Sequence, residues 1–207
     1  MVRTVASIKA SVDELARREA AFAQVLERIG HPEPRVSERG TQTLLRTIVG
    51  QQVSVAAARS MWNKLTARFG DPIDLAAIAE ASDETLREAG LSRQKAGYAR
   101  SLAGLVLSGE LDLDELPTDD EEAIELLTRV KGIGRWSAEI YLLFAEGRPD
   151  AFPAGDLAVQ VQLGKLLGHP ERPSEKLVRE WGEAWRPHRG AAAVLAWHAY
   201  NSTGTAL

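Results

Sequence analysis

Apolar residues recur at helical spacing along almost the whole chain, and this pattern restricts the fold more than any other feature of the sequence. No stretch shows the sustained two-residue alternation of β-branched and aromatic side chains that is typical of a half-buried strand. The 207 residues are 44% hydrophobic, which is enough to bury a core without a disulfide or a metal ion. We therefore predict an all-α globular protein.

Local capping signals predict about ten helices. The first carries an apolar stripe over 15–29 and ends at Gly30. Three later helices are each preceded by a serine that can act as an N-cap: Ser54, Ser82 and Ser92. Asp71-Pro72 is expected to open a short helix, and the Thr-Asp-Asp-Glu sequence at 118–121 predicts a capping box. The last helices are expected near 156–168, 174–185 and 188–203.

The sequence contains no cysteine, which excludes disulfides, thiolate zinc sites, iron–sulfur clusters and a cysteine nucleophile. It also has neither a run of about 20 apolar residues nor a signal-peptide core, so we expect a cytoplasmic protein. The net charge of 25 − 29 = −4 counts against a nucleic-acid partner. However, nine acids and no Lys or Arg lie between Ser101 and Thr128, which leaves −4 + 9 = +5 on the rest. A basic face can therefore exist.

Two glycines flank a single aliphatic residue in the segment 127–138, Leu-Thr-Arg-Val-Lys-Gly-Ile-Gly-Arg-Trp-Ser-Ala. Glycine permits positive φ, which we expect at both positions, and lets a second backbone approach closely. Ile133 can fill the core while the amides of Gly132, Gly134 and the next helix turn outward as a phosphate site, with Lys131 facing the phosphate. A plain helix–helix turn with a glycine C-cap explains the same residues. Both interpretations stay open on these residues alone.

The segment resembles the helix-hairpin-helix element of DNA-repair proteins, in which Val-x-Gly-Ile-Gly is followed by Ser-Ala. Four segments are similar, in order and spacing, to DNA-3-methyladenine glycosylase II: 48–56, 90–96, 132–138 and 185–189. The resemblance covers roughly 35–205. It implies the two-lobed helix-hairpin-helix DNA glycosylase fold, with a DNA-facing cleft between the lobes.

The resemblance also implies how the chain divides. One lobe is expected at about 36–145, containing the hairpin at 130–135, and the other at about 1–35 plus 146–207. Larger members of the family carry an additional N-terminal α/β domain. We expect the compact form, because one helix precedes the matching region here.

In that superfamily a catalytic aspartate follows the hairpin after a Gly/Pro-rich loop. Asp156 fits this place, 156 − 132 = 24 residues beyond Gly132. From the residues alone, Asp156 could equally be an ordinary N-cap, and the two roles can coexist because a helix N-terminus favours a carboxylate. The implied reaction is hydrolysis of the N-glycosidic bond of an alkylated base, such as 3-methyladenine or 7-methylguanine, flipped out of double-stranded DNA in base-excision repair.

Aromatic residues are expected to line the base pocket. Trp136 and Trp197 are the main candidates and Tyr141 is a third, although each Trp could instead fill the core. The loop Gly50–Val53 matches the place from which the family inserts a wedge into the gap left by the flipped base. Its residues are Gln51 and Gln52, with Gln52 at the wedge position. A solvated loop glutamine is the alternative.

Four other functions compete with this hypothesis. A lyase would need a lysine two residues after the second hairpin glycine, and Trp136 stands there, so no lyase activity is expected. A glycosylase for another lesion stays possible, as does a non-catalytic helix-hairpin-helix DNA-binding module, which would need no Asp156. An all-α interaction scaffold leaves the ordered match unexplained.

No cofactor and no side-chain metal site are expected, but the resemblance allows a structural Na⁺ or K⁺ at the hairpin carbonyls. The expected partner is double-stranded DNA with alkylated bases. We expect the protein to bind it as a monomer in the nucleoid, without a membrane.

Overall fold

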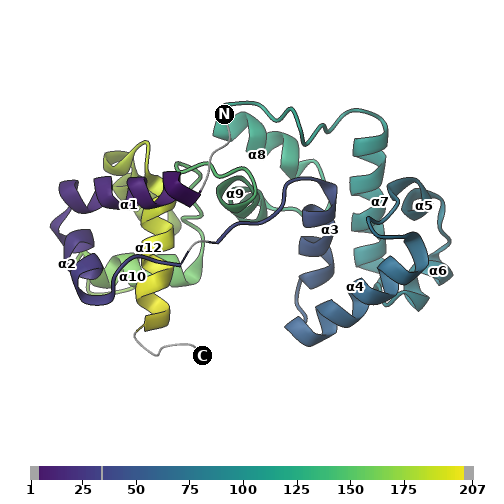
Figure 1. Ribbon diagram of the computed structural model, residues 1–207, viewed down its shortest axis with the longest axis horizontal. Coiled ribbons are helices and arrows are strands. Elements are labelled where there is room, and N and C mark those ends of the chain that lie inside the picture. Colours follow the sequence, from purple (N-terminus) through teal and green to yellow (C-terminus); the bar gives the residue numbers. More distant parts are fainter. Residues whose placement is uncertain (1–4, 34, 203–207) are drawn as a thin grey trace. The chain divides into compact units, whose positions relative to one another are not determined.

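The computed structural model describes residues 5–33 and 35–202, and every regular element in this part of the chain is a helix (Figure 1), which confirms the all-α prediction. In chain order the helices are α1 (Val5–Arg18), α2 (Ala20–Ile29), α3 (Thr41–Gly50), α4 (Val55–Phe69), α5 (Leu75–Glu80), α6 (Asp83–Glu88), α7 (Arg93–Leu107), α8 (Asp120–Thr128), α9 (Arg135–Phe144), α10 (Leu157–Leu166), α11 (Glu175–Gly182), the 3₁₀ turn η1 (Glu183–Trp185) and α12 (Arg189–Ser202). Among the helices described, none has the length and hydropathy needed to cross a membrane.

The described chain divides into two compact units. Unit 1 consists of the residues up to Ser37 and from Glu139 onward, and unit 2 is Glu38–Ala138. The chain passes between the units a second time inside α9. The end of α9 packs in unit 1, where the Phe144 ring lies 5.7 Å from the Trp197 ring. The lobe boundaries expected from the resemblance stay a prediction. The DNA-facing cleft stays a prediction.

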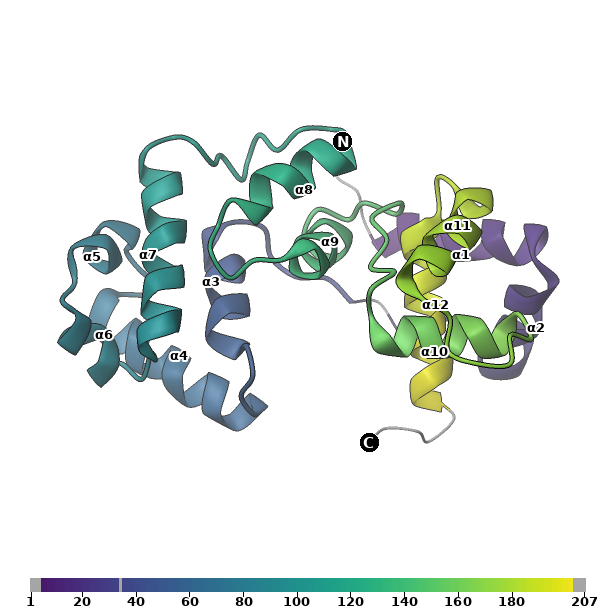
Figure 2. The same cartoon turned by 180° about the vertical axis from the view of Figure 1, so that it is seen from behind.

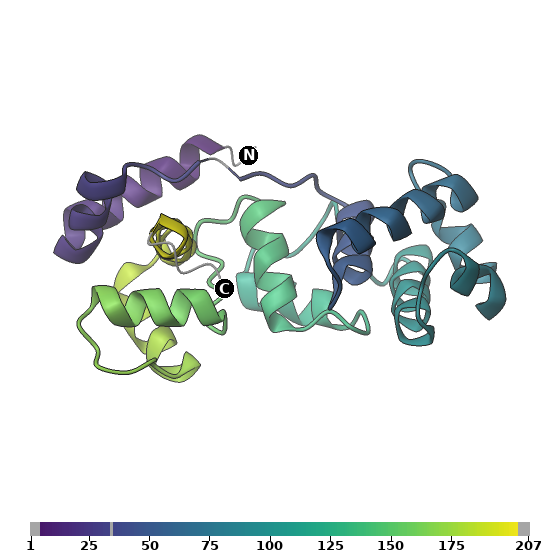
Figure 3. The same ribbon diagram turned by 90° about the horizontal axis from the view of Figure 1, so that it is seen from below.

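Helix α12 is the centre of unit 1. Helices α1 and α2 pack against it from one side and α10 from the other (Figure 3). Small residues dominate its buried face, so the neighbouring helices can approach closely: Ala191, Ala192, Ala193, Ala196 and Ala199. The ring of Trp185 joins this core, with the Phe22 ring at 5.2 Å and the Phe152 ring at 6.1 Å, both edge to face.

Helix α7 has the same central place in unit 2. Helices α3, α5 and α6 pack against it, and α4 packs on α3 (Figure 2). Its buried face again combines small and branched residues: Ala96, Ala99, Leu102 and Ala103. The hairpin 130–134 joins α8 to α9 and lies in unit 2, which ends at Ala138.

Several helix starts agree with the sequence signals. The hydroxyls of Ser54, Ser82 and Ser92 each accept a hydrogen bond from a backbone N–H three residues later, as predicted. Two other starts were wrong by one to three residues. Asp74 rather than Asp71-Pro72 caps α5, and Asp119 rather than Thr118 caps α8. In both helices an aspartate carboxylate accepts two backbone N–H groups, which satisfies more of the first turn than one hydroxyl can.

The region that we predicted to be the first helix forms two helices, α1 and α2. The chain breaks at Glu19, whose backbone is extended at φ −129° and ψ 111°, so that α1 and α2 fold back on each other and both pack on α12. A single straight helix would bury its apolar stripe on only one neighbour.

Candidate active site

The hairpin between α8 and α9 is held rigidly by side chains of unit 2. Ile133 is buried, as predicted, and its N–H donates to the carbonyl of Val130 at 3.0 Å. The backbone N–H of Lys131 donates to the hydroxyl of Ser101 on α7 at 3.0 Å. The carbonyl of Gly132 accepts the side-chain amide of Gln51 at 2.7 Å. The turn is therefore fixed from both sides by partners distant in sequence.

The two hairpin glycines have different roles. Gly132 has φ +85°, and a Cβ placed on it would lie 2.2 Å from Cδ2 of Tyr98, so the Tyr98 ring packs on its bare backbone. Gly134 does not have a positive φ, and a Cβ there would meet nothing within 4 Å. The expectation that both glycines serve positive φ is therefore wrong for Gly134, because only the first turns the chain. Gly134 is exposed and leaves room for another backbone.

The loop after α3 places its two glutamines differently. Gln51 is the C-cap of α3 and turns its side chain inward to the hairpin. Gln52 is exposed and has φ +54°, the left-handed conformation that non-glycine residues rarely adopt. Such strain is typical of functional positions, where the rest of the structure enforces it. Lys95 on α7 supports the loop by donating from Nζ to the carbonyl of Val49 at 2.7 Å, and burial lowers the pKa of its ammonium group.

Asp156 lies at the start of α10, where its carboxylate caps the helix. Its Oδ1 accepts the backbone N–H of Val159 at 3.1 Å, and its own N–H donates to the carbonyl of Pro153 at 3.0 Å. The preceding loop is further tied to α10, because the side-chain amide of Gln160 donates to the carbonyl of Ala154 at 3.0 Å. The N-cap interpretation is therefore correct, and it leaves the catalytic one open.

The same carboxylate oxygen has a second donor from far along the chain. The indole Nε1–H of Trp197 on α12 donates to Oδ1 of Asp156 at 3.0 Å. The Trp197 ring also packs against Phe144 at an interplanar angle of 31°. Two fixed donors on a half-buried carboxylate give it one orientation. A carboxylate held in this way can stabilise positive charge that develops next to it.

A comparison with known protein families identifies the family to which this chain belongs. The family model described as the HhH-GPD superfamily base excision DNA repair protein matches residues 45–187, a stretch that contains the hairpin, the loop with Gln52 and Asp156. The chain belongs to this superfamily. The resemblance inferred from the four sequence segments is thereby confirmed.

Individual proteins that are similar to this chain are consistent with its membership of the superfamily. DNA-3-methyladenine glycosylase 1 of Schizosaccharomyces pombe is 32% identical over 163 residues, covering 75% of this chain and 70% of the relative. The crystal structure of a DNA-3-methyladenine glycosidase from Bacillus halodurans has a TM-score of 0.86 at 31% identity, covering 95% and 91% of the two chains. A structure of the S. pombe 3-methyladenine DNA glycosylase with abasic DNA has a TM-score of 0.76 at 26% identity, covering 95% and 98%. The chain spans only 56% of a Bacillus subtilis relative and 55% of an Escherichia coli one.

The three aromatic candidates for the base pocket of this HhH-GPD protein differ in their contacts and in their exposure. Trp197 contacts Asp156 directly, as described above. Tyr141 is only 4% exposed and lies on the part of α9 that belongs to unit 1. Trp136 lies on the first turn of α9 in unit 2, and with 47% exposure it is the most exposed of the three. A role in a base pocket stays a prediction for each of them.

Charged groups of unit 2 surround the hairpin. Arg135, which begins α9, forms a two-pronged ion pair with Glu121 of α8, with N–O distances of 2.8 and 2.5 Å. Arg129 pairs with Glu110. The acidic segment 101–128 is thus matched in part by arginines next to the hairpin. Lys131 is exposed, as a phosphate-facing lysine must be.

The carbonyl of Val130 accepts a hydrogen bond from Ile133, and the carbonyl of Gly132 accepts one from Gln51. A carbonyl oxygen that accepts a hydrogen bond can also coordinate a cation, and a monovalent cation at the hairpin stays a prediction.

Sequence reasoning missed the side chains that hold the site. Tyr98, Ser101 and Lys95 support the hairpin and the loop before Ser54. Lys95 lies in one of the four segments that carry the resemblance, but its spacing gave no role, because its partner is a backbone carbonyl 46 residues away. Arg179 of α11 was not singled out at all, although it contacts the loop before Asp156.

Proposed function

We propose that this chain is a monofunctional DNA glycosylase that hydrolyses the N-glycosidic bond of alkylated purines in base-excision repair. The observation that carries the proposal is the carboxylate of Asp156, oriented by Val159 and Trp197 at the position where the family resemblance expects the catalytic aspartate. The names of the relatives, which are DNA-3-methyladenine glycosylases, support the substrate class.

The chemistry follows from where charge develops. As the base leaves, its bond electrons depart with it and positive charge builds on the sugar. The ionised carboxylate of Asp156 stabilises that charge and orients the water that attacks the sugar carbon. Because Val159 and Trp197 already hold the carboxylate, it need not reorganise as the bond breaks.

The same reasoning selects the leaving group. None of the candidate site residues is a suitable general acid for a departing neutral base. A base methylated at N3 or N7 of a purine is already cationic, so its glycosidic bond is weak without protonation. Such a base also stacks favourably on an indole face, with a cation–π contribution of about 0.5–2 kcal/mol. Trp136 and Trp197 are the two residues that we propose for this contact.

The partner we propose is double-stranded DNA with one alkylated base, bound by a single copy of the chain in the nucleoid. The exposed Gly134 and Lys131 would meet the DNA backbone, and Gln52 would enter the gap left by the flipped base. No strand cleavage is expected, because Trp136 occupies the position at which a lyase of this superfamily carries its lysine.

Single-turnover excision from duplexes that each contain one defined lesion tests the proposal. We expect 3-methyladenine and 7-methylguanine to be released much faster than uracil or normal purines, with no strand nicking. Faster release of uracil, or of adenine from a mispair, would favour a glycosylase for another lesion. Binding of duplex DNA without release of any base would favour a non-catalytic DNA-binding module.

A further inference from the structure

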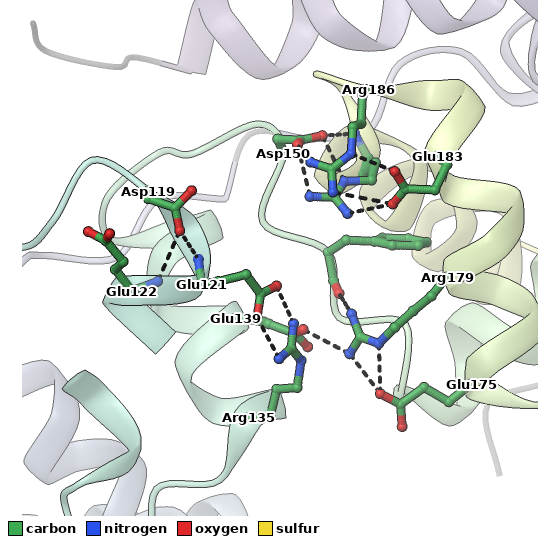
Figure 4. Close-up of polar contacts among 12 residues, drawn as sticks. Asp119, Glu121, Glu122, Arg135, Glu139, Asp150, Glu175, Arg179, Glu183 and Arg186 are labelled. Carbon is green, nitrogen blue, oxygen red and sulfur yellow. Dashed lines mark hydrogen bonds and ion pairs between the residues drawn. The ribbon is translucent and has the colours of Figure 1, made fainter. Parts of the chain in front are cut away.

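One guanidinium in unit 1 joins three segments around the loop that leads to Asp156 (Figure 4). Nη2 of Arg179 donates to Oε1 of Glu139 at 2.9 Å and to Oε1 of Glu175 at 2.7 Å. Nε donates to the same Glu175 oxygen at 3.0 Å, and Nη1 reaches the carbonyl of Phe152 at 3.4 Å. The three segments are α9, the first turn of α11 and the loop 152–155.

Glu139 anchors this arrangement. Its side chain is 1% exposed, whereas the side chain of Arg179 is 27% exposed. A buried carboxylate is stable only with a cationic, hydrogen-bonded partner. The guanidinium therefore stays where Glu139 holds it, and its remaining donors have a fixed direction.

Glu175 links the guanidinium of Arg179 to Gly155, the residue before Asp156. A Cβ built on Gly155 would lie 2.9 Å from Oε2 of Glu175, so this carboxylate rests on the bare backbone of Gly155. Its other oxygen is the one that Arg179 binds twice. The loop is thus restrained at Phe152 by a hydrogen bond and at Gly155 by direct packing, and Asp156 follows immediately.

We propose that Arg179 is a positioning residue for Asp156, acting through the loop 152–155 with Glu139 as its buried anchor. The proposal rests on the catalytic role proposed for Asp156. Asp156 bonds back to Pro153 inside the restrained loop, so a shift of the loop moves the carboxylate. A displacement of about 1 Å at a reacting group can lower a rate about 100-fold.

The test compares Arg179→Met with Lys176→Met. Lys176 is a cation on the same helix, and its ion pair within the described part of the chain is with Glu180, at 4.0 Å. We expect Arg179→Met to lower the single-turnover excision rate by about 10- to 100-fold and to leave the Kd for undamaged duplex within about twofold. Lys176→Met should change neither. Equal rates for the two variants would overturn the proposal.

A second variant separates positioning from folding, because Arg179→Met leaves Glu139 without its guanidinium. The double variant Arg179→Met with Glu139→Gln removes the buried charge together with its partner, and should regain stability. Its excision rate should stay low, because the contacts with Phe152 and Glu175 are still absent. A rate that recovers together with the melting temperature would show a structural role and contradict the inference.

Hydrogen exchange over residues 152–160 gives a readout independent of activity. In both Arg179 variants this peptide should exchange faster than in the wild type, and unchanged exchange would overturn the proposal. The wild type and Asp156→Asn, measured in the same excision assay, keep the two claims apart. If Asp156→Asn is as active as the wild type, the proposed function fails. If Asp156→Asn is inactive but Arg179→Met is not impaired, only the positioning role fails.

Discussion

The indole N–H of Trp197 donates a hydrogen bond to Oδ1 of Asp156 at 3.0 Å, between residues that are 41 positions apart in the sequence. Trp197 is therefore a hydrogen-bond donor to the carboxylate, whereas the sequence suggested a stacking face for the base. Phe144 also packs on its ring, 5.7 Å between centroids. The hydrogen-bond role and the stacking role of Trp197 can therefore be tested by different substitutions.

Replacing Trp197 by Phe tests the donor role. Phe keeps an aromatic ring beside Phe144 but removes the N–H, and a hydrogen bond to a charged group contributes about 1.5–3 kcal/mol. We expect the single-turnover excision rate to fall about 10- to 100-fold. Trp197→Ala should lower it further and reduce binding of undamaged DNA much less. Wild-type excision by Trp197→Phe would mean that the ring acts by stacking alone.

Asp156→Asn tests the carboxylate itself. Asn is as good an N-cap as Asp, so α10 should form normally and the melting temperature should change little. Loss of the negative charge should lower base release by about 10²–10³-fold, while binding of damaged DNA is retained. The measurement is single-turnover release of 7-methylguanine, with circular dichroism as the control for folding. A near-wild-type rate would remove Asp156 from the mechanism.

The hairpin glycines provide a matched pair. Gly132→Ala places a methyl group inside the Tyr98 ring at φ +85°, so we expect the free energy of unfolding to fall by about 2–4 kcal/mol. Gly134→Val meets open space, so it should cost at most about 1 kcal/mol.

Gly134→Val should nevertheless weaken binding to damaged and undamaged duplexes by similar factors, because its side chain would fill the space left for a phosphodiester. Urea unfolding and fluorescence anisotropy would measure the two effects. Loss of affinity for damaged DNA alone would contradict a backbone-binding role for the hairpin.

Gln52→Gly tests the exposed residue at φ +54°. Glycine adopts this conformation without strain, which gains about 1 kcal/mol, but it adds entropy to the unfolded chain, which costs a similar amount. Stability should therefore change by less than about 1 kcal/mol. If Gln52 is the wedge, the ratio of lesion binding to undamaged-DNA binding should drop. An unchanged ratio would leave Gln52 as a solvated loop residue.

Features that depend on near neighbours could be predicted from the sequence. The serine caps at Ser54, Ser82 and Ser92 satisfy N–H groups three residues away, so their signals are local. Burial of Ile133 and the cap formed by Asp156 follow from the same short-range logic. Local signals failed where a nearby aspartate competed, as at Asp74 and Asp119, where packing on α12 broke a helix, and at Gly134, whose φ is not positive.

Which distant groups complete the site depends on how the helices pack in three dimensions. Gln51 reaches the carbonyl of Gly132 across 81 residues, Trp197 reaches Asp156 across 41 and Arg179 reaches Glu139 across 40. The sequence next to each of these residues does not identify the partner that it binds. Their partners are set by how helices pack, and packing depends on the shapes of whole buried faces. No local spacing encodes such a pairing, because a hydrogen bond depends on separation in space and is indifferent to separation along the chain.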